Sequence, residues 1–256
     1  MLKLQAPAKI NLFLRVIAQE KSGFHQLETA FASLEFGDTL TISPGGEGIN
    51  LKTEGPPVGT LEENLVYRAA MAFFQEMGSE EGVRINLIKR VPPGAGLGGG
   101  SSDAATTLLG LHALFPGRVG RDNLLAMAGT LGSDVPFFLS GSSFALAWGR
   151  GDRLFPLPSP PGAPVLLALP PVRVSTPWAY QALAEARSGE PFPRGPCVID
   201  PDRFSTWEGL SSLAENDFQE LVFQEHPVLR RIHAELERAG PRFSLLSGSG
   251  AALFAV

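Results

Sequence analysis

The sequence predicts an α+β fold divided into two domains. Predicted strands and helices follow one another without the strict alternation of a doubly wound parallel sheet. A proline-rich segment, residues 154–171, contains seven prolines around one apolar strand and marks a domain boundary. The 256 residues are enough for two small domains. We therefore expect an N-terminal domain over residues 1–153 and a C-terminal domain over residues 154–256.

The N-terminal half begins with a pattern of period two. Apolar residues alternate with others over residues 8–15, which is typical of a strand and places Lys9 and Asn11 on one face. A helix is expected over residues 62–77 because apolar residues recur there at helical spacing and Gly78 follows as a stop signal. The other elements expected in this half are strands over 39–43 and 83–88 and helices over 104–114 and 122–131.

The C-terminal half reads as one short apolar strand followed by helices. The strand is expected over residues 165–169, a helix after Pro177, and a longer helix over residues 227–239 with a proline in its first turn. The chain ends inside an apolar strand after Ser247-Gly248-Ser249-Gly250-Ala251. That ending predicts an open sheet edge at residues 252–256.

Composition excludes several classes of partner and site. A net charge of −5 and a pI near 5.5 argue against nucleic acid as the main partner. A single cysteine, Cys197, excludes an internal disulfide, and the four histidines lack zinc-site spacing. The N-terminus lacks the apolar core of a signal peptide, and no apolar run approaches the ~18 residues of a membrane span. We expect a cytoplasmic protein with no membrane partner and no metal site of its own.

The strongest local signal is a glycine-rich stretch, residues 92–103, here called the glycine segment. Five glycines fall within seven positions, which lets the backbone approach a ligand and adopt positive φ angles. Ser101, Ser102 and Asp103 are candidate N-caps for the apolar helix that follows. A glycine loop that enters a helix N-terminus presents N–H groups and a positive dipole end to phosphate.

Other interpretations of the glycine segment are weaker. Gly94, Gly96 and Gly99 satisfy the dinucleotide pattern GxGxxG, but two prolines precede the first glycine and no acidic residue follows where a ribose partner belongs. A Walker A loop fails because Gly100 occupies the position of the lysine. A flexible linker would seldom open directly onto a capped apolar helix.

Four stretches, in order along the chain, resemble the GHMP kinases. They are residues 7–14 (PAKINLFL), residues 23–25 (GFH) with Phe31, the glycine segment, and residues 131–137 (LGSDVPF), while residues 247–251 resemble the third glycine motif of the family. The resemblance covers nearly the whole chain and implies a two-domain kinase fold with the active cleft between the domains. It is strongest to the branch that phosphorylates the 2-hydroxyl of 4-diphosphocytidyl-2-C-methylerythritol in non-mevalonate isoprenoid biosynthesis.

The resemblance implies roles for two catalytic residues. Asp134 becomes the base that accepts the proton of the attacking hydroxyl, although a lone Asp after Gly-Ser is more often a turn or cap. Lys9, by default a solvated strand lysine, is implied to lie beside Asp134 and to offset charge on the transferred phosphoryl group.

Substrate-binding residues follow from the same resemblance. Asn11 is implied near the hydroxyl-bearing end of the acceptor, and His25 near its cytosine. Phe24 stands where the family has tyrosine, so a stacking ring remains without the phenol hydroxyl. Tyr180 matches the aromatic residue implied for the other face of the base. The full set expected to bind the acceptor is Asn11, Phe24, His25, Phe31, Thr176, Pro177 and Tyr180.

The nucleotide site implied by the resemblance surrounds the glycine segment. ATP is the expected co-substrate, with Mg²⁺ carried on the nucleotide, and Ser101 and Ser102 are candidates to touch phosphate or Mg²⁺. The residues expected to bind ATP are Asn64, Leu65, Lys89, Pro92, Pro93, Gly94, Ala95, Gly96, Leu97, Gly98, Gly99, Gly100, Ser101 and Ser102.

Three rival functions remain open at this point: another GHMP kinase, a catalytically silent nucleotide sensor, and a nicotinamide-dependent oxidoreductase. The first would not need Gly23-Phe24-His25, and the second would not need Lys9 and Asp134. The expected assembly is a monomer or a homodimer.

Overall fold

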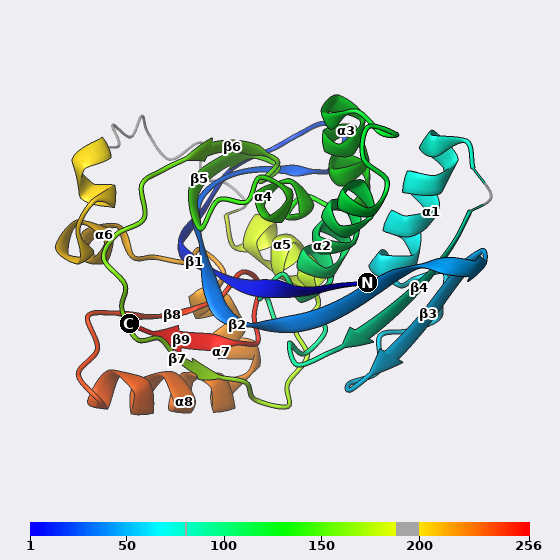
Figure 1. Ribbon diagram of the computed structural model, residues 1–256. Helices are drawn as coiled ribbons and strands as arrows, with labels where there is room; N and C mark the ends of the chain where they lie inside the picture. Colours follow the sequence, from blue (N-terminus) through cyan, green and yellow to red (C-terminus); the bar gives the residue numbers. More distant parts are fainter. Residues whose placement is uncertain (80, 188–199) are drawn as a thin grey trace. The chain divides into compact units, whose positions relative to one another are not determined.

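The protein, seen in a computed structural model, is described for residues 1–79, 81–187 and 200–256 (Figure 1). Cys197 lies outside the described residues. The chain forms two compact units: unit 1 comprises residues 1–9, 33–93 and 98–142, and unit 2 comprises residues 10–32, 94–97 and 143–256. The predicted α+β class is confirmed. The boundary after residue 153 and the cleft between two domains stay predictions.

The larger sheet has six strands in the order β3-β4-β2-β5-β6, with β1 also paired to β2. The strands are β1 (Leu2–Gln19), β2 (His25–Glu47), β3 (Ile49–Glu54), β4 (Glu81–Ile88), β5 (Phe144–Gly149) and β6 (Arg153–Pro156). Strands β3 and β4 are parallel, whereas β2 runs antiparallel to both β4 and β5. Mixed pairing of this kind excludes the all-parallel sheet of a dinucleotide fold.

The helices of unit 1 are α1 (Leu65–Met77), α2 (Gly99–Leu114), α3 (Arg121–Leu131) and α4 (Val135–Leu139). Helices α1, α2 and α3 pack against one another (Figure 1). Helix α1 ends at Gly78, as predicted, with φ of +62°. Its start was predicted three residues too early, because the Asn64 side chain accepts a hydrogen bond from the Val66 N–H and caps the helix there.

Helix α2 begins at Gly99, five residues before the predicted start at Ala104. The prediction that Ser101, Ser102 or Asp103 is the N-cap is therefore wrong: Gly98 holds that position, and these side chains lie inside the helix. The low helix propensity of Gly and Ser is overridden by tertiary contacts at the helix start. After Asp134 the chain enters another helix, since α4 begins at Val135.

Unit 2 contains a three-stranded antiparallel sheet in the order β7-β9-β8. Its strands are β7 (Leu166–Ala168), β8 (Ser244–Leu246) and β9 (Leu253–Ala255). The open edge expected at residues 252–256 is wrong, because β9 pairs with a strand on each side. Strands separated by about 85 residues of sequence supply this pairing, which local patterning does not reveal.

The helices described in unit 2 are α5 (Thr176–Ala186), α6 (Trp207–Leu213), α7 (Gln219–Glu225) and α8 (Pro227–Arg238), with a short 3₁₀ turn at Pro201–Phe204. Helices α5, α7 and α8 contribute apolar residues to the core of this unit. Helix α8 contacts β8 and β9 (Figure 1). The core joins Leu14 and Val16 of β1 to apolar residues of α5, α7, α8 and the small sheet. None of the helices in the described ranges combines the length and the apolar character of a membrane span.

Candidate active site

The glycine segment joins β4 to α2 in a conformation that only glycine adopts readily. Gly94, Gly96 and Gly98 have φ angles of +71°, +81° and +68°. Gly99 is required for a different reason: a Cβ there would lie 2.8 Å from Cγ1 of Val91. Three glycines with positive φ therefore lead the backbone directly into the first turn of α2, where the leading N–H groups lack intrahelical acceptors. The defined backbone conformation and close packing of these glycines exclude a flexible linker.

The tip of the glycine segment rests on the C-terminal Ser-Gly-Ser-Gly motif. The Ser247 hydroxyl donates to the Gly96 carbonyl at 3.0 Å, and the Ala252 N–H donates to the Ala95 carbonyl at 3.0 Å. A Cβ on Gly96 would lie 2.0 Å from the Ser247 carbonyl oxygen, so the two backbones touch. The C-terminal motif therefore holds the backbone of residues 95 and 96 in place.

Asn216 fixes the C-terminal motif in turn. Its side-chain amide donates to the carbonyls of Leu246 and Gly248, and its side-chain oxygen accepts from the Phe218 N–H. All three bonds are buried. This residue was not identified from the sequence; the Asn-Asp pair at residues 216–217 is the signal that could have indicated it, since Asn and Asp are frequent in turns.

Lys9 and Asp134 form an ion pair beside the start of α2. Nζ of Lys9 lies 3.5 Å from Oδ2 of Asp134, and their side chains are 5% and 30% exposed. Asp134 occupies the N-cap position of α4 but makes no capping hydrogen bond through its side chain. The common role of a lone Asp as a cap is therefore not the one it has here. Lys9 is buried, which corrects its default interpretation as a solvated strand lysine.

Close contacts place the glycine segment next to this pair. A Cβ on Gly98 would lie 3.1 Å from Cγ of Lys9 and 3.0 Å from the Phe138 ring on α4. A Cβ on Gly132, two residues before Asp134, would lie 3.8 Å from Oγ of Ser101. A helix N-terminus, a buried ammonium and an accessible carboxylate thus meet within unit 1.

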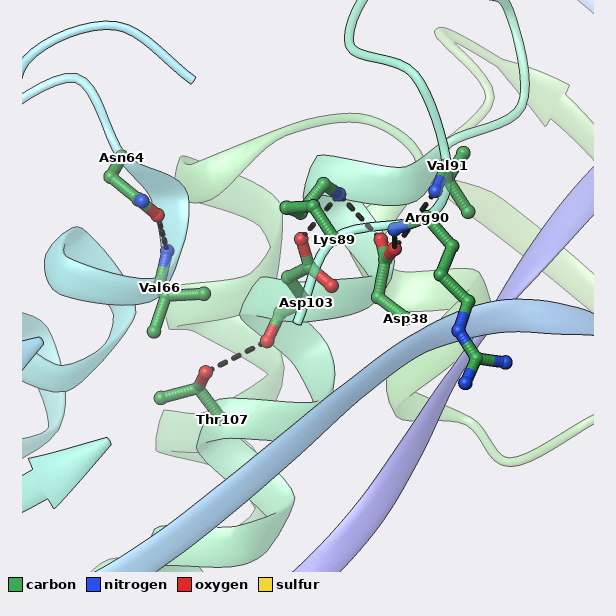
Figure 2. Close-up of polar contacts among 8 residues, drawn as sticks. All are labelled: Asp38, Asn64, Val66, Lys89, Arg90, Val91, Asp103 and Thr107. Carbon is green, nitrogen blue, oxygen red and sulfur yellow. Dashed lines mark hydrogen bonds and ion pairs between the residues drawn. The ribbon is translucent and has the colours of Figure 1, made fainter. Parts of the chain in front are cut away.

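The remaining predicted nucleotide residues of unit 1 also gather at the start of α2. A Cβ on Gly100 would lie 3.5 Å from Leu65, next to the cap residue Asn64. Lys89 immediately follows β4, and a Cβ on Gly99 would lie 3.2 Å from its Nζ. Lys89 is buried and ion-paired with Asp38 and Asp103 (Figure 2), whereas a lysine at the end of a strand is usually exposed.

Two of the predicted acceptor residues, His25 and Tyr180, lie together in unit 2. The rings of His25 and Tyr180 stack with centroids 4.5 Å apart, and Tyr180 meets Phe218 edge-on at 4.8 Å. Within the described ranges, Nε2 of His25 is buried without a hydrogen-bond partner, and desolvation lowers the pKa of this histidine. An unsatisfied ring nitrogen on an aromatic stack is a natural place for a polar planar ligand.

Phe24 presents an exposed ring, 56% accessible, next to His25. The Arg150 guanidinium lies 4.0 Å from the ring centroid and forms an ion pair with Glu20 at 2.5 Å. The hydrogen bond from Arg150 lowers the pKa of Glu20. Arg150 was not identified from the sequence, because its contact is made by the turn after β5, far along the chain.

The other predicted acceptor residues occupy varied positions in unit 2. The Asn11 amide donates to the Thr29 hydroxyl at 2.8 Å, and a Cβ on Gly248 would lie 3.6 Å from Asn11 Oδ1. The hydroxyls of Thr176 and Ser249 are 2.8 Å apart at the start of α5, where Pro177 is exposed. Phe31 is only 2% exposed and lies in the core.

Family models match both halves of the chain. The GHMP kinase N-terminal domain matches residues 64–142, and the GHMP kinase C-terminal model matches residues 202–256. The chain belongs to the GHMP kinase family, and the protein is therefore a small-molecule phosphotransferase that uses ATP. An oxidoreductase function is excluded by this membership.

Within the family, the chain is similar to kinases that share one name. The 4-diphosphocytidyl-2-C-methyl-D-erythritol kinase of Thermus thermophilus is 41% identical over 249 residues, which cover 97% of this chain and 85% of the relative. The enzyme of the same name from Solibacter usitatus is 41% identical over 98% of this chain and 79% of its own.

Solved structures of GHMP kinases also match this chain. A crystal structure of 4-(cytidine 5'-diphospho)-2C-methyl-D-erythritol kinase matches with 40% identity and a TM-score of 0.83, covering 100% of this chain and 90% of that one. L. major mevalonate kinase, solved in complex with R-mevalonate, matches with 15% identity and a TM-score of 0.67 over 100% of this chain and 86% of its own. The second match shows the fold alone.

Proposed function

We propose that the protein transfers the γ-phosphoryl group of ATP to the 2-hydroxyl of 4-diphosphocytidyl-2-C-methyl-D-erythritol, giving the 2-phosphate and ADP. The observation that carries this proposal is the Lys9–Asp134 pair, 3.5 Å apart, beside a glycine-rich helix start. Relatives of about 40% identity over nearly the whole chain carry the name of this kinase and support the choice of acceptor.

Asp134 is proposed as the catalytic base. Its partly exposed carboxylate accepts the proton of the acceptor hydroxyl as that oxygen bonds to the γ-phosphorus and the bond to the ADP oxygen breaks. The Lys9 ammonium is proposed to offset negative charge on the transferred phosphoryl group. The buried stem of Lys9, packed against Gly98, holds the ammonium in place.

The glycine segment is proposed to bind the phosphates of ATP, with Asn64, Leu65 and Lys89 near the nucleoside. Backbone N–H groups at the start of α2 are the donors, and the helix dipole adds a favourable potential. Mg²⁺ would enter on the nucleotide and supply charge neutralisation when bound. The hydroxyls of Ser101 and Ser102 fit such an ion, since Mg²⁺ prefers oxygen ligands and the Ser102 hydroxyl is buried without a partner in the described residues.

Phe24, His25 and Tyr180 are proposed to bind the cytosine base. The exposed Phe24 ring offers a stacking face, and Nε2 of His25, which is buried without a partner among the described residues, offers a hydrogen-bonding position. Asn11, Thr176 and Pro177 complete the proposed acceptor site, and Phe31 supports it from the core. We also propose a cytoplasmic location, where ATP is available, a monomer or homodimer, and a domain boundary after residue 153.

The test is ADP release, with ³¹P NMR of the product, from purified protein, Mg-ATP and a panel of acceptors. The panel contains the cytidine compound, methylerythritol phosphate, homoserine, mevalonate and galactose. The proposal predicts turnover of the cytidine compound alone. Turnover of another acceptor would keep the kinase chemistry and overturn the base-binding role of Phe24, His25 and Tyr180. Nucleotide binding without any turnover would instead favour a sensor.

A further inference from the structure

Three ionisable side chains, those of Asp38, Lys89 and Asp103, form a buried network in unit 1. Nζ of Lys89 lies 2.5 Å from Oδ2 of Asp38 and 2.7 Å from Oδ2 of Asp103 (Figure 2). The side chains of these residues are at most 4% exposed. Burying ionisable groups costs free energy unless each is well paired. Stability alone therefore does not explain why these three side chains are buried together.

The network connects the two ends of the glycine segment. Asp38 comes from β2, and its Oδ1 accepts the N–H groups of Arg90 and Val91, at 2.5 and 2.9 Å, where the chain leaves β4. Asp103 comes from the first turns of α2, where the segment ends. Lys89 bridges the two carboxylates, with the Gly99 backbone packed closely against its ammonium. The positions at which the segment begins and ends are thus fixed by one ammonium.

The charges of the network do not balance, because two carboxylates share one ammonium. Asp38 receives hydrogen bonds from two backbone N–H groups and from Lys89, so both of its oxygens have partners. Asp103 receives one from Lys89, and among the described residues its Oδ1 has no partner. The excess proton therefore belongs on Asp103.

The electrostatic surroundings agree with this assignment. Desolvation, opposed by the Lys89 charge and assisted by the Asp38 charge, raises the pKa of Asp103 to about 7. The charged groups that act on this carboxyl are Lys89, at the end of β4, and Asp38, on β2; α1, α3 and α4, which also pack against α2, add none within the described residues.

We propose that Asp38, Lys89 and Asp103 position the glycine segment for the phosphates of the nucleotide, with Asp103 acting as a neutral carboxylic acid. This inference rests on the proposed function in that ATP is the ligand of the segment. Loss of the Asp103 proton leaves an extra buried negative charge beneath the start of α2, where it opposes a phosphate anion. Nucleotide affinity therefore falls as the pH rises past neutrality.

The test is the dissociation constant of the magnesium complex of a non-hydrolysable ATP analogue, measured by calorimetry at pH 6 and at pH 8.5. Asp103→Asn retains the shape of the neutral acid but cannot ionise. The wild-type Kd is expected to rise about tenfold between the two pH values, an effect of about one pKa unit. The Kd of D103N is expected to change less than about twofold. A D103N profile that follows the wild type would overturn the proposal.

Two further variants separate positioning from general damage to α2. Asp38→Asn keeps an oxygen for the two backbone N–H groups but replaces the oxygen that pairs with Lys89 by an NH2 group, so the Kd of this variant is expected to be about tenfold higher at pH 6. Thr107→Val is the matched control: Thr107 is buried on α2 and donates only to the Asp103 backbone carbonyl, so its Kd should stay within about twofold of the wild type. An unchanged Kd in D38N would contradict positioning, and an equal loss in T107V would reduce the effect to damage of the helix.

This readout does not depend on the acceptor. If the protein phosphorylates none of the acceptors, the proposed function fails while the nucleotide measurement stays interpretable. If D38N does not fold, the pH comparison between wild type and D103N still decides the matter.

Discussion

Two buried lysines of unit 1 meet aspartates in opposite ways. Lys9 is paired with Asp134, whose side chain is 30% exposed, whereas Lys89 is paired with Asp38 and Asp103, at 0% and 4%. The ammonium groups are similarly desolvated, so access to the carboxylate is what differs. A carboxylate that solvent and ligands reach is able to exchange a proton with a substrate, and one sealed in the core is suited to holding backbone in place. The first pair is therefore assigned to chemistry and the second to positioning.

Removing Lys89 is expected to give the largest change in stability. Lys89→Met leaves two carboxylates buried without a cation, so the free energy of unfolding should fall by about 3–5 kcal/mol at pH 8. Denaturant titration measures this loss, which should shrink at pH 5, where protonation relieves the carboxylates. A loss below about 1 kcal/mol would show that the network is not the anchor described here.

Removing Lys9 should affect turnover more than stability. Lys9→Met deletes the charge proposed to stabilise the transferred phosphoryl group, and kcat is expected to fall about 10²–10³-fold. Steady-state kinetics at saturating ATP and acceptor measures it. If kcat stays near the wild-type value while the protein is destabilised like K89M, the division of roles between the two lysines is wrong.

Protonation of Asp103 predicts a pH dependence of stability. Because its pKa of about 7 lies above the ordinary value of about 3.9, the folded state binds more protons between these pH values. The free energy of unfolding contributed by Asp103 therefore falls as the pH rises from about 4 to 7, by at most ~1.4 kcal/mol per pH unit. The difference between wild type and D103N, followed by denaturant titration across this range, isolates the term. Parallel curves would place the proton elsewhere.

The smallest effect is expected from a third lysine pair on the surface. Nζ of Lys52 lies 3.2 Å from Glu54, but the side chains are 74% and 49% exposed. Lys52→Met should change the free energy of unfolding by less than about 0.5 kcal/mol and leave kcat unchanged. It serves as the control for both buried lysines, and a large effect would mean that removal of any lysine charge perturbs the protein.

Much of the fold could be predicted from local chemistry. Gly78 ends α1, the alternation over residues 83–88 gives β4, and the glycine segment opens onto a helix as expected. The start of α2 could not be predicted, because Gly99, Gly100 and the serines favour a loop by propensity. Packing of Gly99 on Val91 and Lys89 overrides that preference.

The residues of the candidate site also differ in whether local sequence reveals them. Residues in motifs, such as Lys9 and Asp134, were found because their family pattern is local in sequence. The partners of Lys89 lie 51 and 14 residues away, so its burial could not be deduced from its own strand. Asp38 gave only a faint signal, an isolated acid at the start of the strand Thr39-Leu40-Thr41-Ile42. Contacts that are distant in sequence decide which charged residues are buried.

Asp134 is assigned a chemical role that the buried aspartates do not have. The most direct measurement is the single-turnover rate of Asp134→Asn at saturating Mg-ATP and cytidine acceptor, together with its nucleotide Kd. We expect a rate lower by about 10²–10⁴-fold with the Kd within about twofold of the wild type. A near-normal rate would remove Asp134 from the mechanism, and a rate loss explained by a weakened Kd would make it a binding residue instead.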